Sequence, residues 1–375
     1  MKIYMNFEIK IYHSFDTSLK IIWKAFEEES ANYCFQSCEW FENWVNNYRV
    51  NNNNFLLYIV VVKHESKVVC ILPFEIEKKF KFRILKWAGD KQSDYCCPLL
   101  RKNLNFDRKT FVDLFNQVLD LIKNVDVIYL IKQPEYIEGI KNPFIEFSGN
   151  FTDSKTYNIL LPKTWEYYKD QILKKEFHLQ NLRKKKSLKK IGNLNFKIYN
   201  DQNEKINVMK KLFSQKNIRL SSQGIKDILK LEDLEFYKKF EESALKNIKT
   251  HLSALILNDE LIAIHWGIIY KKRFYYLLLS MKENQLSKYS PGRLLISLLI
   301  RWSISKKLEV FDFTLGDENY KKSWSNKNSY LFNYVESKSL KGFNLFLLIK
   351  LKLFLKQIDK KNYFKKMALM VKKKL

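Results

Sequence analysis

Residues 274–324 read FYYLLLSMKENQLSKYSPGRLLISLLIRWSISKKLEVFDFTLGDENYKKSW. An aromatic and leucine-rich run, a polar turn, a helical repeat of leucines, a second apolar run and a polar loop follow one another. We therefore expect a strand, a turn, an amphipathic helix, a buried strand and a loop. The chain has nine glycines, and two of them, Gly292 and Gly316, fall at the expected helix start and just after the second strand. Because a backbone without a Cβ can approach a ligand closely, we expect the functional site here.

The expected helix start has the composition of an anion-binding turn. Ser290 suits the N-cap position, and Pro291 suits the first turn because its missing N–H would have had no partner there. The remaining first-turn amides lie at the positive end of the helix dipole, which favours a phosphate or pyrophosphate. Gly292 has no side chain to block that approach, and Arg293 can add a forked contact.

The chain around this segment predicts two similar domains. The first half predicts, in order, strand 1–12, helices 18–29 and 36–48, the hairpin 55–63 with 67–76, helix 107–123 and strand 125–131. The second half predicts strand 156–161, a long helical region 164–191, strand 196–199, helices 202–214 and 232–247, and strands 251–257, 261–270 and 273–281. The similar order indicates a structural duplication. We predict an α/β (α+β) protein with two tandem domains, each a mixed twisted sheet flanked by helices.

The polar stretch 148–155 is the expected boundary, which gives domains 1–152 and 153–335 and a tail, 336–375. The tail is strongly basic, with twelve lysines and one aspartate in its last 38 residues. Its apolar run is interrupted by Lys350 and Lys352, so it is too short and too charged to span a bilayer. Two interpretations remain open: a basic amphipathic helix on an anionic membrane surface, or a C-terminal helix docked on the domain.

The net charge of +27 favours anionic partners. Only nine of the 67 basic residues are arginine, however, so a solvated lysine-rich surface is the alternative. The first fifteen residues alternate like a strand and predict neither a signal peptide nor a membrane span. An odd number of cysteines in a chain of this length predicts a reducing, cytoplasmic compartment, and their spacing predicts no metal site. These cysteines are Cys34, Cys38, Cys70, Cys96 and Cys97.

The common nucleotide patterns G-x-x-x-x-G-K-[ST] and G-x-G-x-x-G are absent, which argues against NTPases and classical dehydrogenases. Instead, a hairpin, a strand ending at Met281, a helix start and a further strand follow the order of the acyl-CoA-dependent N-acetyltransferase (GNAT) superfamily. Four segments resemble its BioF2-like, CelD/BcsL-type branch, which is associated with polysaccharide biosynthesis. They are IAIHWGIIY (262–270), YYLLLSM (275–281), KYSPGRLLISLLIRWSISKKL (288–308) and FDFTLGDENYKKSW (311–324).

The resemblance extends over most of residues 1–335. FQSCEWFENW (35–44) and GDKQSDYCCPLL (89–100) are similar to the aromatic helix and the Ser-Asp-Tyr turn of that branch. The chain departs from the superfamily in lacking its Q/R-x-x-G-x-G/A pyrophosphate loop, which is reduced here to Ser-Pro-Gly-Arg. Related FemABX transferases, which build peptidoglycan bridges, use aminoacyl-tRNA as the donor on the same double fold. The resemblance therefore implies a double GNAT-like fold and leaves two donors open.

In the superfamily, a splayed strand pair receives the pantetheine arm of acyl-CoA and the helix start receives its pyrophosphate. The resemblance implies acyl-CoA as co-substrate and no metal. The expected donor-binding residues are Leu279, Met281, Tyr289, Ser290, Pro291, Gly292 and Arg293.

The resemblance also implies direct attack of a neutral amine on the thioester, which needs a proton acceptor, oxyanion donors and a donor to the thiolate. Backbone N–H groups of strand 275–281 would stabilise the oxyanion, and Asp317 or its neighbour Glu318 would take the amine proton. Tyr320 would donate to the thiolate, and Lys321 would hold an anionic group. Packing or turn-capping roles remain open for these residues.

Four further residues complete the expected site. His265 is an alternative base, or else a hydrogen-bonded core histidine. In the first domain, Trp40, Asp94 and Tyr95 are expected on the acceptor side, because aromatic rings beside a carboxylate suit a sugar. Core packing for Trp40 and a turn for Asp94 are the alternatives.

The sequence thus predicts a cytoplasmic acyltransferase whose second domain alone retains a donor site. Its expected acceptor is an amine on a small-molecule or lipid-linked sugar of a surface polysaccharide, and its tail would add a location on the inner face of the membrane. One alternative is an aminoacyl-tRNA-dependent transferase that grips RNA with the lysine-rich helix 174–190; otherwise no nucleic acid is expected. Another is a non-catalytic protein that binds membranes or polyanions.

Overall fold

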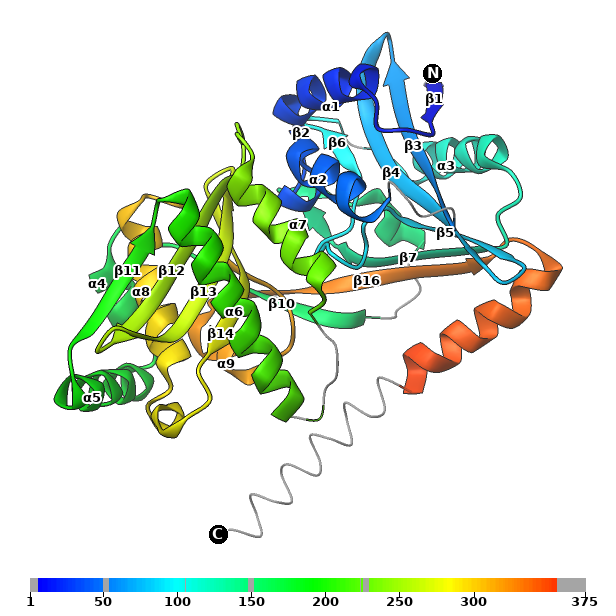
Figure 1. Cartoon of the computed structure of the whole chain (residues 1–375). Coiled ribbons are helices and arrows are strands. Elements are labelled where there is room, and N and C mark those ends of the chain that lie inside the picture. Colours follow the sequence, from blue (N-terminus) through cyan, green and yellow to red (C-terminus); the bar gives the residue numbers. More distant parts are fainter. Residues whose placement is uncertain are drawn as a thin grey trace. The chain divides into compact units, whose positions relative to one another are not determined.

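The computed structural model describes residues 6–49, 54–104, 106–147, 152–222, 224 and 229–355 (Figure 1). The chain divides into two compact units. Unit 1 comprises residues 1–41, 51–155 and 330–375, and unit 2 comprises residues 42–50 and 156–329. The linear boundaries expected at residues 152 and 335 stay predictions.

Unit 1 contains an antiparallel meander, a crossover helix and a parallel strand. Its elements are β1 (Glu8–Tyr12), α1 (Thr17–Glu29), β2 (Ser30–Ala31), η1 (Cys34–Gln36), the start of α2 (Cys38–Tyr48), β3 (Phe55–His64), β4 (Lys67–Lys79), β5 (Phe82–Trp87), β6 (Leu99–Arg101), α3 (Arg108–Ile122), β7 (Val127–Pro134), β8 (Tyr136–Ile137), β9 (Ile140–Lys141) and η2 (Pro143–Phe147). A late strand, β16 (Lys327–Ser337), pairs with β7.

The strand order in unit 1 is β1-β3-β4-β5-β7-β16. Among the described strands of unit 1, β5 and β7 are the pair that runs parallel, and α3 is the helix that connects them. The β3–β4 hairpin turns at Glu65 and Ser66, both of which have a positive φ, as the two-residue turns that match strand twist require. Phe115 of α3 packs against Phe74 of β4 and so joins the helix to the sheet.

Unit 2 repeats this plan in the second half of the chain. Its elements are β10 (Thr152–Leu160), α4 (Trp165–Tyr167), η3 (Tyr168–Ile172), α5 (Lys175–Ile191), β11 (Leu194–Tyr199), α6 (Gln202–Ser222), α7 (Leu231–Glu242), β12 (Lys249–Leu257), β13 (Glu260–Tyr270), β14 (Arg273–Met281), η4 (Gln285–Tyr289), α8 (Pro291–Ser305), β15 (Val310–Leu315) and α9 (Asn319–Trp324). β10 and β16 carry the chain from one unit into the other.

The strand order in unit 2 is β10-β15-β14-β13-β12-β11. In the described part of unit 2, β14 and β15 are the pair that runs parallel, and α8 connects them. Helices α5 and α8 pack into one apolar core with the sheet, whereas α6 and α7 lie on the other side of strands β12 to β14 (Figure 1). Both units therefore place a crossover helix between a meander and a parallel strand, which confirms the expected duplication and the α/β class.

Most predicted elements are present, and three expectations need correction. The long helical region 164–191 is broken, because Leu173 and Lys174 adopt extended backbone conformations where Leu173 turns into the core. The segment after Gly316 is not only a loop, since it contains α9. Strand β16 was not expected at all.

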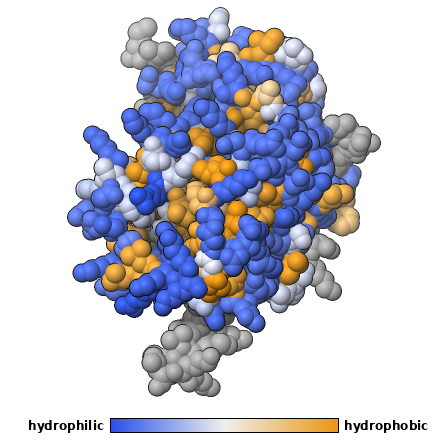
Figure 2. Space-filling model, turned by 60° about the vertical axis from the view of Figure 1, so that its left-hand side comes forward, coloured by the Kyte–Doolittle hydropathy of each residue, from blue (hydrophilic) through white to orange (hydrophobic). Residues whose placement is uncertain are grey.

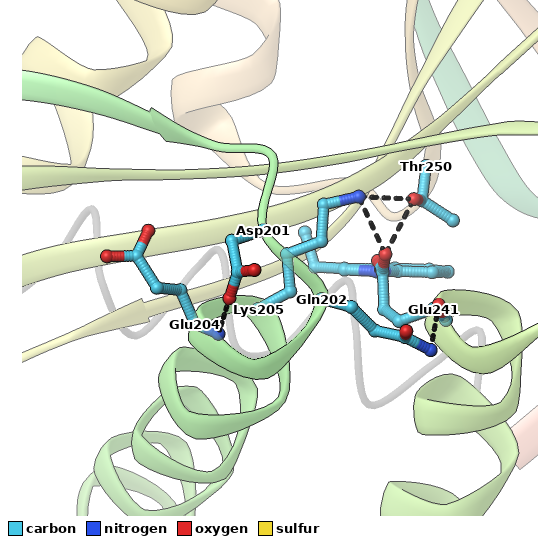
Figure 3. A network of polar contacts seen from close by, with 7 residues as sticks. Asp201, Gln202, Glu204, Lys205, Glu241 and Thr250 are labelled. Carbon is cyan, nitrogen blue, oxygen red and sulfur yellow. Dashed lines mark hydrogen bonds and ion pairs between the residues drawn. The ribbon is translucent and has the colours of Figure 1, made fainter.

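A buried carboxylate ties the helices on the second face of unit 2 to the sheet (Figure 3). Glu241 of α7 accepts hydrogen bonds from Trp266 Nε1 at 2.6 Å, Thr250 Oγ1 at 2.8 Å and Lys205 Nζ at 2.9 Å. Gln202 of α6 donates to the backbone carbonyl of Glu241. Every polar group in the centre of this network has a partner, which identifies it as a structural joint.

The described part of the predicted basic tail is helical over residues 340–355, so the expected C-terminal helix is confirmed there. Residues 356–375 of the tail lie outside the described residues. None of the helices in the described ranges is long and apolar enough to cross a membrane.

Candidate active site

The parallel strands of unit 2 separate after three paired positions. β14 and β15 are in register at Arg273 with Val310, Phe274 with Phe311 and Tyr275 with Asp312, and no further pair follows. On its other side β14 stays paired with β13 as far as Met281. The edge of β14 that follows Tyr275 is therefore open toward β15, and backbone N–H groups there are available to a ligand.

The last paired residue of β15 helps to turn that strand away. Asp312 is buried and forms an ion pair with Arg273 Nη1 at 3.1 Å. Its other oxygen accepts from the backbone N–H of Thr314 at 2.8 Å, and Thr314 has a φ of 56°. Gly316 follows with a φ of 137°, a conformation that favours glycine. The Asp312 side chain thus holds the end of β15 in a left-handed bend, and this bend separates β15 from β14.

The start of α8 lies at the end of the open edge, and it differs from the expected cap. Ser290 occupies the N-cap position but has φ 52° and ψ 59°, and its side chain makes no capping hydrogen bond. Its hydroxyl instead accepts from Lys184 Nζ at 2.5 Å. Pro291 occupies the first helical turn as expected. The correction has a physical reason, since a left-handed residue does not hold its side chain over the first-turn amides.

In the first turn of α8, the N–H of Gly292 has no backbone acceptor, so fewer amides are left for an anion than the sequence predicts. The N–H of Arg293 donates to the carbonyl of Ser290 at 3.0 Å. The N–H of Gly292 donates to Met281 Sδ at 3.2 Å, and a thioether is a weak acceptor. A Cβ on Gly292 would lie 2.4 Å from that sulfur and 3.2 Å from Leu279 Cδ2. The structure therefore brings together Leu279, Met281 and Gly292, as predicted, with Met281 over the amide.

Two cations, Lys184 and Arg293, flank this helix start, and neither forms an ion pair with a carboxylate among the described residues. Arg293 lies over the ring of Phe177 and donates from Nη1 to Gln180 Oε1 at 3.0 Å. Its Nε and Nη2 are buried and have no hydrogen-bond partner among the described residues. Burial and the charge of Arg293 lower the pKa of Lys184. Cations held together in this way, beside the positive end of a helix, suit an anion.

Helix α5 adds polar groups that the sequence reasoning missed. Asn181 is buried, and neither of its amide atoms has a hydrogen-bond partner among the described residues. It lies on the same helix face as Phe177 and Lys184, at four- and three-residue spacing. The sequence signal for this residue was an asparagine on the same helix face as the apolar Leu188. The many lysines of α5 hide that apolar face in the sequence. Tyr289, the last residue of η4, is half-buried against the core.

Asp317 lies beyond the end of β15 and is held by a neighbouring strand. Tyr157 of β10 donates to Asp317 Oδ1 at 2.8 Å. Asp317 is half-buried, whereas the side chain of Glu318 is 54% exposed and pairs with Lys321. Of the two expected bases, the structure gives Asp317 the fixed position.

Tyr320 and Lys321 lie on α9, directly after Asp317. Burial and then the nearby Glu318 charge raise the pKa of Tyr320, so its hydroxyl stays protonated at neutral pH. Lys321 is buried, and its ammonium contacts the carbonyl of Leu315 at 2.7 Å and Glu318 at 3.0 Å. These contacts close the end of β15, and the expected role of Lys321 toward an anion stays a prediction.

His265 lies in the interior of unit 2, away from solvent. Its ring stacks on Tyr276 at 4.4 Å, and neither ring nitrogen has a hydrogen-bond partner among the described residues. Burial, followed by the nearby His251 and Lys216, lowers the pKa of His265 well below its usual value. His251, 6.2 Å away between ring centroids, has its pKa lowered to about 3 by burial. The alternative role of His265 as the base stays a prediction.

The expected acceptor residues all lie in unit 1. Trp40 is buried and contacts Phe35 edge-on at 5.1 Å, and the buried Tyr95 contacts the same ring at 5.8 Å. Gln36 donates to the carbonyl of Tyr95 at 2.7 Å. Asp94 is half-buried beside them in the chain. The structure thus gathers Trp40 and Tyr95 in the core of unit 1, and their role toward an acceptor stays a prediction.

Comparisons with known proteins address both halves of the chain. Residues 177–322, from α5 to α9, match the family model of the acetyltransferase (GNAT) domain. No curated protein matches the chain significantly. The crystal structure of FemX is similar over 91% of this chain and 99% of its own, with 11% identity and a TM-score of 0.59. Its similarity, like the duplicated topology, extends over both units.

Two further solved structures agree. The structure of L-PGS from Bacillus licheniformis covers 90% of this chain and 98% of its own, with 10% identity and a TM-score of 0.54. A conserved protein of unknown function from Bacteroides thetaiotaomicron covers 87% and 100%, with 10% identity and a TM-score of 0.52. At these identities the likeness concerns the fold.

Unit 2 contains the segment that matches the GNAT domain, and the chain as a whole shares the fold of FemX.

This fold gives the geometry of unit 2 its chemical context. The GNAT match includes the splayed β14–β15 pair, the start of α8 and the loop that carries Asp317 and Tyr320. The GNAT match therefore contains the elements of unit 2 that form the candidate site. Within the described ranges, no group of three or more His, Cys, Asp or Glu side chains could hold a metal ion.

Proposed function

We propose that this double GNAT protein transfers an acyl group from acyl-CoA to an amine, with the donor bound in unit 2. The single observation that carries the proposal is the open edge of β14 leading to an uncapped helix start between Lys184 and Arg293. An elongated donor with an apolar arm and a phosphorylated end matches this succession of an open strand edge and two unneutralised cations. In the finer proposal, the acceptor is an amino sugar or a cell-envelope polysaccharide precursor, as in the BioF2-like branch.

The residues around the open edge can carry the transfer. The amine nitrogen attacks the thioester carbonyl carbon, and the resulting oxyanion accepts hydrogen bonds from backbone N–H groups of β14 beyond Tyr275. The ammonium proton passes to Asp317, whose Oδ2 is left for it because Tyr157 donates to Oδ1. The C–S bond then breaks with its electron pair on sulfur, so that an amide and a thiolate are formed.

In this proposal, Tyr320 stabilises that thiolate. Because burial raises its pKa above that of a free thiol near 8.5, full proton transfer from Tyr320 is uphill. We assign it the role of a hydrogen-bond donor to the leaving thiolate, which takes a proton from solvent while Asp317 releases to solvent the proton that it accepted from the amine.

Calorimetry with acetyl-CoA and longer acyl-CoAs tests the donor site. We expect saturable binding that weakens about tenfold in Arg293→Ala, because a hydrogen-bonded charge is lost. Arg301→Ala is the matched control, since Arg301 lies farther along the same helix and is exposed. Equal binding by both variants, or no binding by the wild type, contradicts the donor assignment.

Turnover with a panel of amino sugars, followed by mass spectrometry, tests the chemistry separately. Asp317→Asn should lower kcat about 100-fold or more with donor binding intact, because general-base catalysis contributes at least that much. The exposed Glu309→Gln is the control. If Asp317→Asn turns over normally, another group takes the amine proton.

A second donor, aminoacyl-tRNA, is favoured by a specific observation. Met281 covers the one open amide at the start of α8, and helix α5 exposes a row of basic side chains. An RNA backbone would use such a row. Binding of charged tRNA in a filter assay, with no response to any acyl-CoA, would replace the first donor by the second.

A further inference from the structure

The helix 340–355 of unit 1 is fixed at its start. Ser339 Oγ accepts from the N–H of Gly342 at 3.1 Å and donates to Asp126 Oδ1 at 2.6 Å. Lys341 forms an ion pair with Asp126 Oδ2 at 3.1 Å. A Cβ on Gly342 would lie 2.2 Å from the carbonyl of Asp126. These contacts fix the start of the helix on unit 1.

One face of this helix packs on unit 1. Leu353 is buried with Val127 and Val335, and other side chains of the same face pack against that cluster. These are Leu345, Phe346 and Ile349. The prediction of a C-terminal helix docked on its domain describes this inner face.

The opposite face is also apolar, but it is exposed. Leu340 is 97% exposed and Leu348 is 63% exposed. Seven of the nineteen large apolar side chains that are exposed in the described ranges belong to these sixteen residues. This outer face consists of Leu340, Phe343, Leu347, Leu348, Leu351, Phe354 and Leu355.

Lysines border the outer face on both sides. At about 100° per residue, the outer face spans an arc of about 140°, with Lys350 beyond one edge and Lys341 and Lys352 beyond the other. Burial lowers the pKa of Lys350, whose ammonium lies over the ring of Phe346. Residues 337–358 contain no Asp or Glu. This arrangement suits a membrane surface, because the apolar arc can insert among the acyl chains while the lysines on both sides contact the headgroups.

We propose that the outer face of helix 340–355 docks the protein on an anionic lipid bilayer, with the helix axis parallel to the surface. Charge complementarity selects this occupant over a second copy of the chain. Each copy carries a net charge of +27, and the bordering lysines would meet their equivalents across a dimer interface. The arc is also wider than the narrow seam that a helix pair requires. The proposal is independent of the acyl donor.

Flotation with vesicles tests this docking. The full-length protein should float with vesicles of two parts phosphatidylcholine to one part phosphatidylglycerol, and much less with phosphatidylcholine alone. Leu348→Glu with Leu351→Glu should weaken this partition at least tenfold. The control Ile21→Glu with Leu121→Glu places the same charges on exposed apolar sites of unit 1 and should leave partition unchanged. Circular dichroism checks that both variants fold.

A charge variant separates the borders from the face. Lys350→Gln with Lys352→Gln should weaken binding to the anionic vesicles about 30-fold, and added salt should have less effect on it than on the wild type. Absence of vesicle binding, or equal loss in the face variant and its control, overturns the proposal. A wild-type dimer that the face variant converts to a monomer, without vesicle binding, assigns the face to a second copy instead.

Discussion

The two crossover helices hold equivalent places in the two units but begin in different ways. In unit 1, α3 starts after Asp107, whose carboxylate accepts from the N–H of Thr110 at 2.9 Å and from its hydroxyl at 2.6 Å. In unit 2, α8 starts after the left-handed Ser290, which caps nothing and contacts Lys184. One helix start is neutralised by its own anion, whereas the other is left positive.

This difference shows how equivalent helix starts in a duplicated fold can differ in their ability to bind an anion. A capping carboxylate satisfies the amides and repels a phosphate, so α3 gains stability and loses the ability to bind an anion. The start of α8 keeps that ability and lacks the capping hydrogen bond. The duplicated topology alone does not distinguish the two units. The residue before each helix does.

The largest effect should come from the joint that holds unit 2 together. Glu241→Ala leaves Lys205 and Trp266 without their buried acceptor, and we expect a loss of about 3–5 kcal/mol in the free energy of unfolding. Urea denaturation followed by circular dichroism measures it. Glu204 lies next to Lys205 on α6 (Figure 3), and its side chain forms an exposed ion pair with Lys197. Glu204→Ala should therefore change the free energy of unfolding little. Similar losses in both variants would show that the network is not a structural joint.

Converting one helix start into the other tests the comparison directly. Ser290→Asp places a carboxylate among the first-turn amide, Lys184 and Arg293, where it should exclude an anionic donor. We expect binding of acyl-CoA to weaken about 100-fold, since a like charge opposes the ligand. The reciprocal change in unit 1, Asp107→Ser, should leave donor binding unchanged in the same calorimetry. If Ser290→Asp binds normally, the donor does not reach α8.

Acid should destabilise unit 2 through its buried histidines. In the folded state their pKa values lie below the unfolded value near 6.5, so the unfolded chain binds more protons as the pH falls. Stability is full above that pH and is lost below it, by about 1.4 kcal/mol per pH unit for each histidine. Between pH 6 and 4, a range of about two units, the free energy of unfolding of His265→Phe should fall less steeply than that of the wild type, because one histidine fewer takes up a proton on unfolding. Tyr276→Phe, which changes the stacked neighbour, should not alter the slope.

The smallest effect should appear at the capped helix. Asp107→Ala removes the capping hydrogen bonds of α3, so the Tm of the unit should fall by about 2–4 °C. Ser290→Ala should lower the Tm less, because Ser290 makes no capping bond and loses only its contact with Lys184. Scanning calorimetry compares the two variants. Equal shifts would mean that the two starts do not differ as described.

Much of the fold could be predicted from local pattern. The meander of unit 2, with β14 at Arg273–Met281, follows from apolar runs separated by short polar turns. Strand β16 was missed although Tyr330, Phe332 and Tyr334 recur at period two, because its partner β7 lies about 200 residues earlier in the chain. The break before α5 was missed as well, since the local helical pattern continues through Leu173 and only burial of that side chain ends the helix.

The candidate site divides in the same way. Leu279, Met281, Gly292 and Asp317 could be named from the sequence, because strand ends and helix starts mark where backbone and ligand can meet. Lys184 and Asn181 could not. They lie more than 100 residues before Ser290. The sequence does not distinguish among the lysines of α5, and only the packing of one face of α5 against α8 brings Lys184 to Ser290.

The sequence by itself determined most of the order of elements, the duplication and the place of the turn before α8, since apolar periodicity, Pro and Gly act over a few residues. Only the tertiary structure decided which helix start stays open and which cations flank it. It also decided that the tail helix is apolar on two faces, of which unit 1 covers one. Capping, burial and charge pairing depend on neighbours that the chain brings together only when it folds.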